Sequence, residues 1–201
     1  MWRMPSATPD NAAEDSDESL MLRFAGGDIG AFDVLYARHE LGVWRYVFRS
    51  VRVQAVADDL LQDVWFAVAR SAPTYTVSAR FKTWLFTMAH NRVVDHFRTA
   101  KQHVSIDVQG DDDEGPSLGD TLAADSGFGP VRRLESSEQA AALIAAVEQL
   151  PLEQREAFLL QAEGGLSVEG IAKATGVSFE TAKSRLRYAR NSLRQQLQEF
   201  A

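Results

Sequence analysis

Basic residues gather in SFETAKSRLRYARNSLRQQL, residues 178–197, in a chain whose formal net charge is −7. The stretch contains one acid, Glu180. Four of its cations recur at spacings of four, three and four residues: Lys183, Arg187, Arg190 and Arg194. Side chains at those spacings share one face of a helix. Such a cationic face tracks nucleic-acid phosphates, but a plain solvated helix face shows the same pattern.

The residues around this stretch favour a helix-turn-helix. LSVEGIAKATGVSFETAKSRL reads as a short helix capped by Ser167, a turn at Gly176, and a second helix capped by Ser178. Gly176 adopts the left-handed backbone of such a turn at little cost. An apolar stripe faces inward from the second helix, formed by Ala182, Leu186, Ala189, Leu193 and Leu197. This layout favours DNA binding over a merely solvated face.

The start of the second helix is the part that would enter the major groove. The side chains placed to reach DNA there are Ser178, Phe179, Glu180, Thr181, Lys183 and Ser184. Glu accepts a hydrogen bond from cytosine, Lys donates to guanine, and Thr or Ser pairs with either partner or touches a thymine methyl. Arg185 lies off the basic face and would approach DNA from another side.

A second basic segment lies on a helix expected from Ala79 to about Gln102, with Ser78 as its cap. Most of this helix is apolar, which is typical of the central helix of a domain. Four polar side chains share another face: Thr87, Asn91, Arg98 and Lys101. Asn reads base edges, and Arg and Lys hold backbone phosphates. Tyr75 could stack on an unpaired base, although a loop tyrosine more often packs in the fold, and Trp84 is expected in the core.

A third polar face lies on the helix expected over 54–70, around ADDLLQDVWF. Its buried stripe is Leu61, Val64, Trp65 and Val68, at i, i+3, i+4 and i+7. The opposite face carries Asp59, Gln62, Asp63 and Phe66. An exposed aromatic among acids is a candidate hot spot for a protein partner. The alternative is an ordinary solvated face with one stray phenylalanine.

Helical periodicity dominates the chain and no strong strand pattern occurs, so the predicted fold class is all-α. A short helix should end at Gly26-Gly27, and Asp28 should cap a long helix reaching about Val51. The helical pattern resumes near Arg132, and Pro151 fits the first turn of a later helix.

Composition divides the chain into two helical domains joined by a flexible acidic linker. The predicted parts are a disordered acidic tail, a first domain, the linker, and a second domain with the helix-turn-helix: 1–17, 18–103, 104–135 and 136–201. Seven acids and no bases fall in residues 104–125. The charge asymmetry indicates a nucleic-acid partner.

Several classes of function are disfavoured. The chain contains no Cys, and His90 and His96 lie six residues apart, which is poor spacing for a shared helical metal site, so neither metal nor cofactor is expected. It has no Gly-rich phosphate loop, so an enzyme is not expected either. No apolar run is long enough to cross a membrane, and the N-terminus lacks a secretory core. A cytoplasmic protein without membrane insertion is therefore predicted.

The order of these motifs resembles a known family. DDLLQDVW, then ARFKTWLFTMAHNRVVDHFR, an acidic linker, and LPLEQREAFLLQAEGGLSVEGIAKATGVSFETAKSRLRYAR follow one another. The chain is similar to bacterial sigma factors of the extracytoplasmic-function (ECF) class, which keep only the second and fourth sigma domains. The resemblance covers about residues 18–103 and 136–197 and implies a DNA-binding subunit of RNA polymerase that directs transcription initiation.

The resemblance implies a role for each face. The residues for binding core RNA polymerase would be Asp59, Gln62, Asp63 and Phe66. Those for capturing the non-template strand of the −10 element would be Tyr75, Thr87, Asn91, Arg98 and Lys101, with a flipped base held by Tyr75 and Asn91. Those for reading the −35 element would be Ser178, Phe179, Glu180, Thr181, Lys183, Ser184, Arg185, Arg187 and Arg190. The linker would thread the polymerase's RNA path, and an anti-sigma factor would be a further partner.

The sequence departs from the family pattern at three positions. Glu180 stands where the family has Gly or another small residue, Ala182 where it has Val, and Asp63 where it has Glu. A stand-alone helix-turn-helix transcriptional regulator is the alternative function. Residues 20–103 weigh against the response-regulator form of that alternative, because a receiver domain needs parallel strands and a phospho-acceptor pocket.

Overall fold

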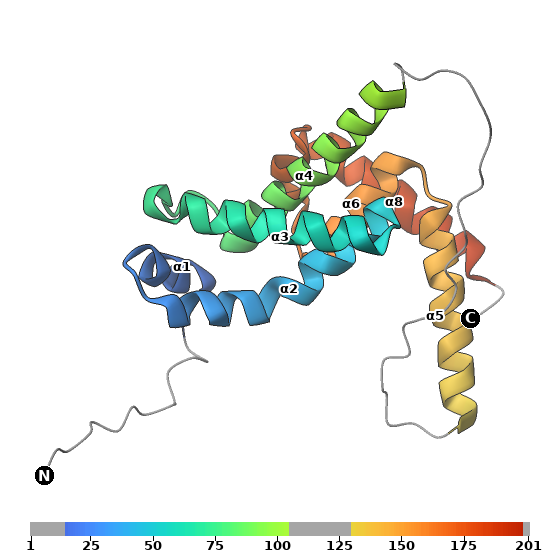
Figure 1. The fold of residues 1–201 in the computed structure, drawn as a ribbon. Coiled ribbons are helices and arrows are strands. Elements are labelled where there is room, and N and C mark those ends of the chain that lie inside the picture. Colours follow the sequence, from blue (N-terminus) through green and yellow to red (C-terminus); the bar gives the residue numbers. More distant parts are fainter. Residues whose placement is uncertain (1–14, 105–129, 199–201) are drawn as a thin grey trace, which may run out of the picture.

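The computed structural model describes residues 15–104 and 130–198, with side chains for 15–100 and 139–198. Its elements are α1 (Asp17–Ala25), α2 (Ile29–Val51), α3 (Gln54–Ser71), η1 (Ala72–Thr74), α4 (Phe81–Val104), α5 (Pro130–Glu148), α6 (Leu152–Ala162), α7 (Val168–Thr175) and α8 (Phe179–Gln196). Helices α1–α4 form one bundle and α5–α8 a second (Figure 1). The described residues contain no strand, which confirms the all-α prediction. None of their helices is long and apolar enough to cross a bilayer.

The first bundle is built around α2, α3 and α4. Asp28 caps α2 by accepting a hydrogen bond from Ala31 N at 3.3 Å, as predicted. The expected stripe of α3 is buried. Trp65, from that stripe, lies 4.9 Å from the Tyr36 ring and 5.7 Å from that of Phe32. These aromatic contacts fix α3 on α2 and leave the opposite face of α3 outward.

Two predicted boundaries in this bundle were wrong. The central helix begins at Phe81 rather than Ala79, and Ser78 does not cap it. Glu18 of α1 supplies the cap instead, since its Oε1 accepts a hydrogen bond from Phe81 N at 2.7 Å. Asp17, assigned to the tail, begins α1. Its carboxylate lies 2.8 Å from Nε2 of the buried His39.

The second bundle contains the expected helix-turn-helix. Ser167 caps α7 and Ser178 caps α8, each accepting a hydrogen bond from the amide three residues later. Gly176 has φ +67°, the left-handed conformation that the turn requires. Helix α5 begins at Pro130, so the last six residues of the predicted linker are helical. Residues 1–14 and 105–129, which carry the rest of the tail and linker, lie outside the described residues.

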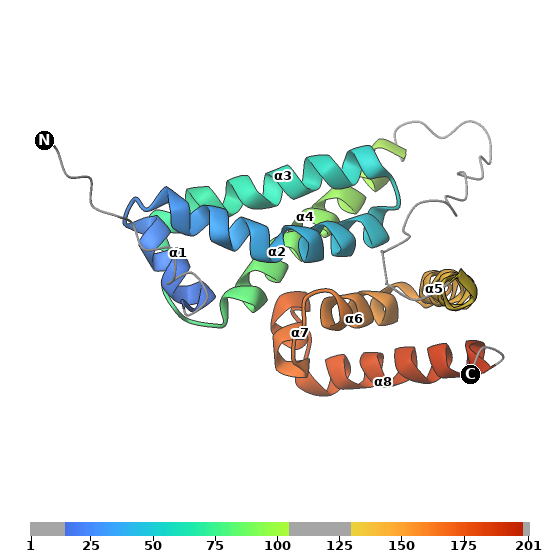
Figure 2. The same ribbon diagram turned by 90° about the horizontal axis from the view of Figure 1, so that it is seen from below.

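The two bundles contact each other through α2 and α4 on one side and α6 and α7 on the other (Figure 2). Glycines permit close approach, because a Cβ on Gly42 would lie 3.1 Å from Glu163 O and one on Gly170 would lie 3.2 Å from Thr83 Oγ1. Arg49 Nε pairs with Glu163 Oε1 at 3.4 Å. Helix α8 lies on the far side of the second bundle from α2 and α3 (Figure 2), so it remains accessible.

Candidate nucleic-acid interface

Helix α8 has a buried apolar stripe and a broad exposed polar face. The predicted stripe is buried at Ala182, Leu186, Ala189 and Leu193, whereas its last member, Leu197, follows the end of α8 and is half-buried. The predicted DNA-facing residues at its start are exposed, except for half-buried Ser184: Ser178, Phe179, Glu180, Thr181 and Lys183. Lys183, Arg187, Arg190 and Arg194 line one shallow cleft with Val168 of α7. The four spaced cations thus share one face.

Neighbouring side chains orient most of these cations. Arg190 donates to Gln161 Oε1 of α6 at 2.6 Å. Arg187 lies over the Tyr188 ring, 5.0 Å from its centroid. Lys183 lies 3.9 Å from Glu180 and 5.9 Å from the centre of the Phe179 ring. Because these contacts are weak and exposed, each cation can still pair with a phosphate. Because the contacts already restrict the side-chain rotamers, less conformational entropy is lost when DNA binds.

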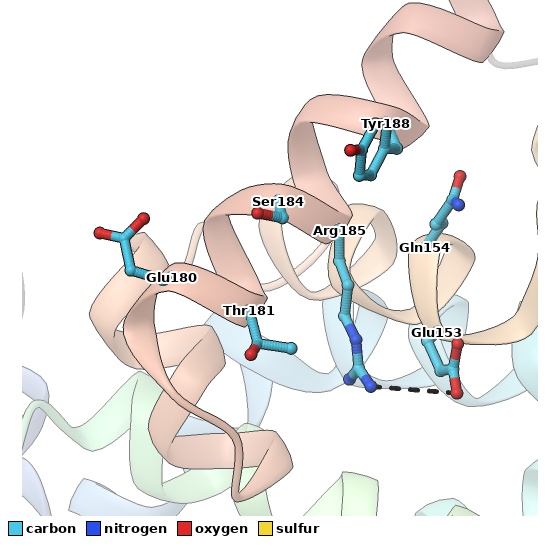
Figure 3. A pocket seen from close by; sticks show the side chains of 7 residues that line it. All are labelled: Glu153, Gln154, Glu180, Thr181, Ser184, Arg185 and Tyr188. Carbon is cyan, nitrogen blue, oxygen red and sulfur yellow. Dashed lines mark ion pairs between the residues drawn. The ribbon is translucent and has the colours of Figure 1, made fainter.

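Arg185 lies in a separate cleft, as its register indicated. This cleft lies between the starts of α6 and α8 and has a volume of about 350 Å³. Its lining is Glu153, Gln154, Glu180, Thr181, Ser184, Arg185 and Tyr188 (Figure 3). Arg185 reaches toward Glu153, at 3.9 Å, whereas Glu180 projects away from both (Figure 3). Both side chains lie 3.9 Å from an opposite charge, but Glu180 is far more exposed than Arg185 and is therefore the more accessible to a base edge.

The polar face of α4 is less exposed than that of α8. Thr87 is half-buried and its hydroxyl donates to Thr83 O at 2.7 Å. Asn91 is exposed, and Arg98 is exposed and paired with Asp95 at 2.9 Å. The side chain of Lys101 lies outside the described residues. Thr87, Asn91 and Arg98 fall within about 40° of one another around the helix axis, taking 100° per residue.

Tyr75 belongs to an aromatic cluster at the start of α4. Its ring meets Trp84 edge-on at 5.0 Å and Phe81 at 6.5 Å. Phe81 is fully buried, whereas Tyr75 and Trp84 are half-buried. The Tyr75 hydroxyl is buried and has no hydrogen-bond partner among the described residues. Burial, followed by the nearby charges of Glu18 and Asp17, raises its pKa, so the hydroxyl stays protonated. Tyr75 lies in the segment before α4, whereas Asn91 lies within α4, and no contact between them is observed.

The face of α3 opposite Trp65 is open. Asp59, Gln62 and Asp63 are exposed, and the Phe66 side chain is 65% exposed. None of the four makes a hydrogen bond or ion pair with another described residue. An unpaired acidic face around a large exposed aromatic suits association with a basic partner surface.

Comparison with known proteins decides the family. Residues 35–103 match the model of Sigma-70 region 2, and residues 140–193 match that of Sigma-70, region 4. CarQ of Myxococcus xanthus, an RNA polymerase sigma factor, is 34% identical over 90% of this chain and 97% of its own. The chain belongs to the ECF class of sigma factors. The ECF sigma factor SigM of Mycobacterium tuberculosis is 32% identical over 90% of this chain and 84% of its own.

Solved protein structures have the same fold. CnrH, solved with the cytosolic domain of CnrY, superposes with a TM-score of 0.63 at 22% identity over 93% of this chain and all of CnrH. RpoE of Bartonella quintana, solved with the anti-sigma factor NepR, gives 0.62 at 22% identity over 83% of this chain and 96% of RpoE. This sigma factor therefore directs RNA polymerase to promoters and initiates transcription there.

Two features of the sigma factor were missed by sequence reasoning. The sequence analysis assigned no role to Glu18, which caps α4, or to Gln161, which orients Arg190. Both act across long sequence separations, and no local spacing signals such contacts. The absence of a convincing cap at the true start of α4, where Arg80 precedes Phe81, was the one available hint for Glu18.

Proposed function

We propose that this sigma factor divides initiation among three helices. Helix α3 binds core RNA polymerase, α4 with Tyr75 captures the melted −10 strand, and α8 reads the duplex −35 element. The observation that carries the proposal is that each helix buries one stripe and leaves a polar face of suitable chemistry exposed. The predicted domain bounds, 18–103 and 136–201, go with this division.

The core contact is proposed for Asp59, Gln62, Asp63 and Phe66. Phe66 would be the apolar anchor, and the acids would steer the domain toward a basic surface of the polymerase. Among the described residues none of these four side chains has a hydrogen-bond or ion-pair partner, which supports this assignment, because binding would break no such contact there.

The −10 contact is proposed for Tyr75, Thr87, Asn91, Arg98 and Lys101. Stacking on an aromatic ring stabilises an unpaired base by about 1–3 kcal/mol. Asn91 would pair with a base edge and Arg98 would hold backbone. Melting then needs no catalytic group, because the captured strand is removed from the duplex equilibrium.

The −35 contact is proposed for the exposed face of α8. Thr181, Lys183 and Ser184 would face base edges near the helix start, while Arg187 and Arg190 would hold phosphates. Ser178, Phe179 and Arg185 would border the groove. Glu180, exposed and projecting away from Arg185 and Glu153, would favour a cytosine amino group.

Run-off transcription over a promoter library tests the proposal. Purified core polymerase with this sigma factor should initiate at a defined subset of templates, and core alone should not. Enriched templates should share two conserved elements separated by a spacer of nearly constant length. Binding to promoter DNA without any core-dependent initiation would favour the stand-alone regulator instead. We further propose that the chain acts in the cytoplasm, beside the polymerase, and has no catalytic step of its own.

We also propose an anti-sigma factor as a partner. NepR is an anti-sigma factor solved on the related fold of RpoE, and CnrY was solved on CnrH. The open face of α3 supports the idea, because a partner covering Phe66 would exclude polymerase directly. A photocrosslinker at position 66 should label a polymerase subunit when core is added. In cells at rest it should label a different protein, and the same label in both states would contradict the proposal.

A further inference from the structure

The start of α4 is held by a residue far away in the sequence. Glu18 lies in α1, 63 residues before Phe81. Its carboxylate accepts a hydrogen bond from the first backbone amide of α4, Phe81 N, at 2.7 Å. Arg80, at the position before Phe81, has no oxygen in its side chain to serve as a cap. A carboxylate at this site also meets the positive end of the helix dipole. Helix α4 therefore begins where it does because α1 is present.

The same contact fixes the aromatic cluster. Phe81 is fully buried and borders three rings, with His39 at 5.5 Å, Trp84 at 5.7 Å and Tyr75 at 6.5 Å. Fixing the Phe81 amide thus fixes the platform against which Tyr75 rests. Residues 75–80, between η1 and α4, contain no helix that would hold them independently. Within this segment, Ser78 N donates a backbone hydrogen bond to Thr76 O at 2.8 Å.

We propose that Glu18 is a positioning residue for capture of the −10 strand, because its cap on Phe81 holds Tyr75 and Trp84 where an unpaired base can stack. This rests on the proposed function of Tyr75. Helix α1 precedes the region 2 match, which begins at residue 35. Because the buried Tyr75 hydroxyl has no hydrogen-bond partner among the described residues, ring packing rather than a hydrogen bond positions this side chain.

The variants Glu18→Ala and Asp17→Asn test the proposal as a matched pair. Asp17 anchors the same helix, but to Arg38 and His39 of α2 rather than to α4. Holoenzyme is formed from core polymerase and each full-length variant. Three affinities are then measured: for core, for a −35 duplex, and for a labelled single-stranded −10 oligonucleotide. The promoter sequence comes from the run-off library.

Glu18→Ala should weaken binding of the −10 strand about fivefold, which is the usual worth of a lost cap, and should leave the other two affinities unchanged. Asp17→Asn should leave all three affinities unchanged, even where it lowers the melting temperature. Equal losses in the two variants would overturn the proposal, since they would mean that α1 only stabilises the domain.

A local cap provides the rescue. Arg80→Ser places a hydroxyl at the position before Phe81, and Glu18→Ala combined with Arg80→Ser should bind the −10 strand as well as Arg80→Ser alone. Absence of rescue would show that Glu18 acts other than by capping. If wild-type holoenzyme failed to initiate at any promoter, the proposed function itself would fail, which is a separate outcome from a failure of the Glu18 variants.

Discussion

The two helices that we propose contact DNA, α4 and α8, are held in different ways. Helix α8 shows its polar face to solvent, with cations already oriented by Gln161, Tyr188 and Glu180. Helix α4 is packed along much of its length, is capped by Glu18, and borders the contact with α7. Duplex DNA has a regular shape that a rigid exposed helix can read. A captured base needs aromatic surface, which is costly to leave exposed, so Tyr75 and Trp84 stay half-covered.

The largest effect should come from the polymerase contact on which both DNA readers depend. Asp63→Arg places a cation in the exposed acidic face of α3 and should weaken core binding on the order of 100-fold, since like charges then oppose each other at the interface. Fluorescence anisotropy with labelled sigma factor measures this. Asp33→Arg is the control, because Asp33 is an exposed acid on α2 outside that face. Similar losses for both variants would mean that net charge rather than a defined face governs binding.

Substitution of Tyr75 should give the next largest loss of affinity, confined to binding of the −10 strand by the α4 region. Tyr75→Ala should weaken binding of the single-stranded −10 element about 10- to 100-fold, through lost stacking. Tyr75→Phe should keep the stacking and raise Tm by about 2–4 °C, because it removes a buried hydroxyl without a partner. Strand-binding assays and thermal melts test the pair. Loss of strand binding in Tyr75→Phe would show that the hydroxyl, rather than the ring, recognises the base.

Arg187 should give a smaller effect, confined to α8. Arg187→Ala should weaken −35 duplex binding about fivefold on all sequences. The slope of the logarithm of the binding constant against the logarithm of salt concentration should fall in magnitude by about one. Glu180→Ala should instead change which bases are preferred, with little change in the slope, because Glu180 contacts no phosphate in this proposal. Titrations at several salt concentrations separate the two. A sequence-dependent loss for Arg187→Ala would move that residue from backbone to base contact.

The sequence was sufficient to predict the buried stripes and local caps of these helices, but not the contacts between distant helices that hold them in place. Spacing was enough to predict the buried stripe of α8 and the open face of α3, because both follow from helix geometry. Caps by Asp28, Ser167 and Ser178 were found because each acts within three residues. The start of α4 was misplaced because its cap comes from α1. The contact between the bundles was not predicted, since it depends on glycines and ion pairs with no local signature.

The contact between the bundles limits how α4 and α8 can bind one promoter. The numbers −10 and −35 are base-pair positions, so the two elements lie about 25 base pairs apart, or about 85 Å at 3.4 Å per base pair. Each bundle has a radius of gyration of about 13 Å, so two bundles in contact are too short to reach both elements at the same time. Under the proposed function, the pairing of Arg49 with Glu163 and the close approach at Gly170 therefore belong to a state in which the two elements are not both engaged.

The smallest effect should come from loosening this contact. Arg49→Glu opposes two carboxylates where a half-buried pair now joins α2 to α6, so it should raise the population of separated domains. Small-angle scattering should show a larger radius of gyration, and core affinity should improve about twofold, because binding no longer has to open the molecule. Arg49→Glu combined with Glu163→Arg restores opposite charges and should reverse both changes. If the double variant stayed extended, the packing of Gly42 and Gly170 rather than the ion pair would hold the domains together.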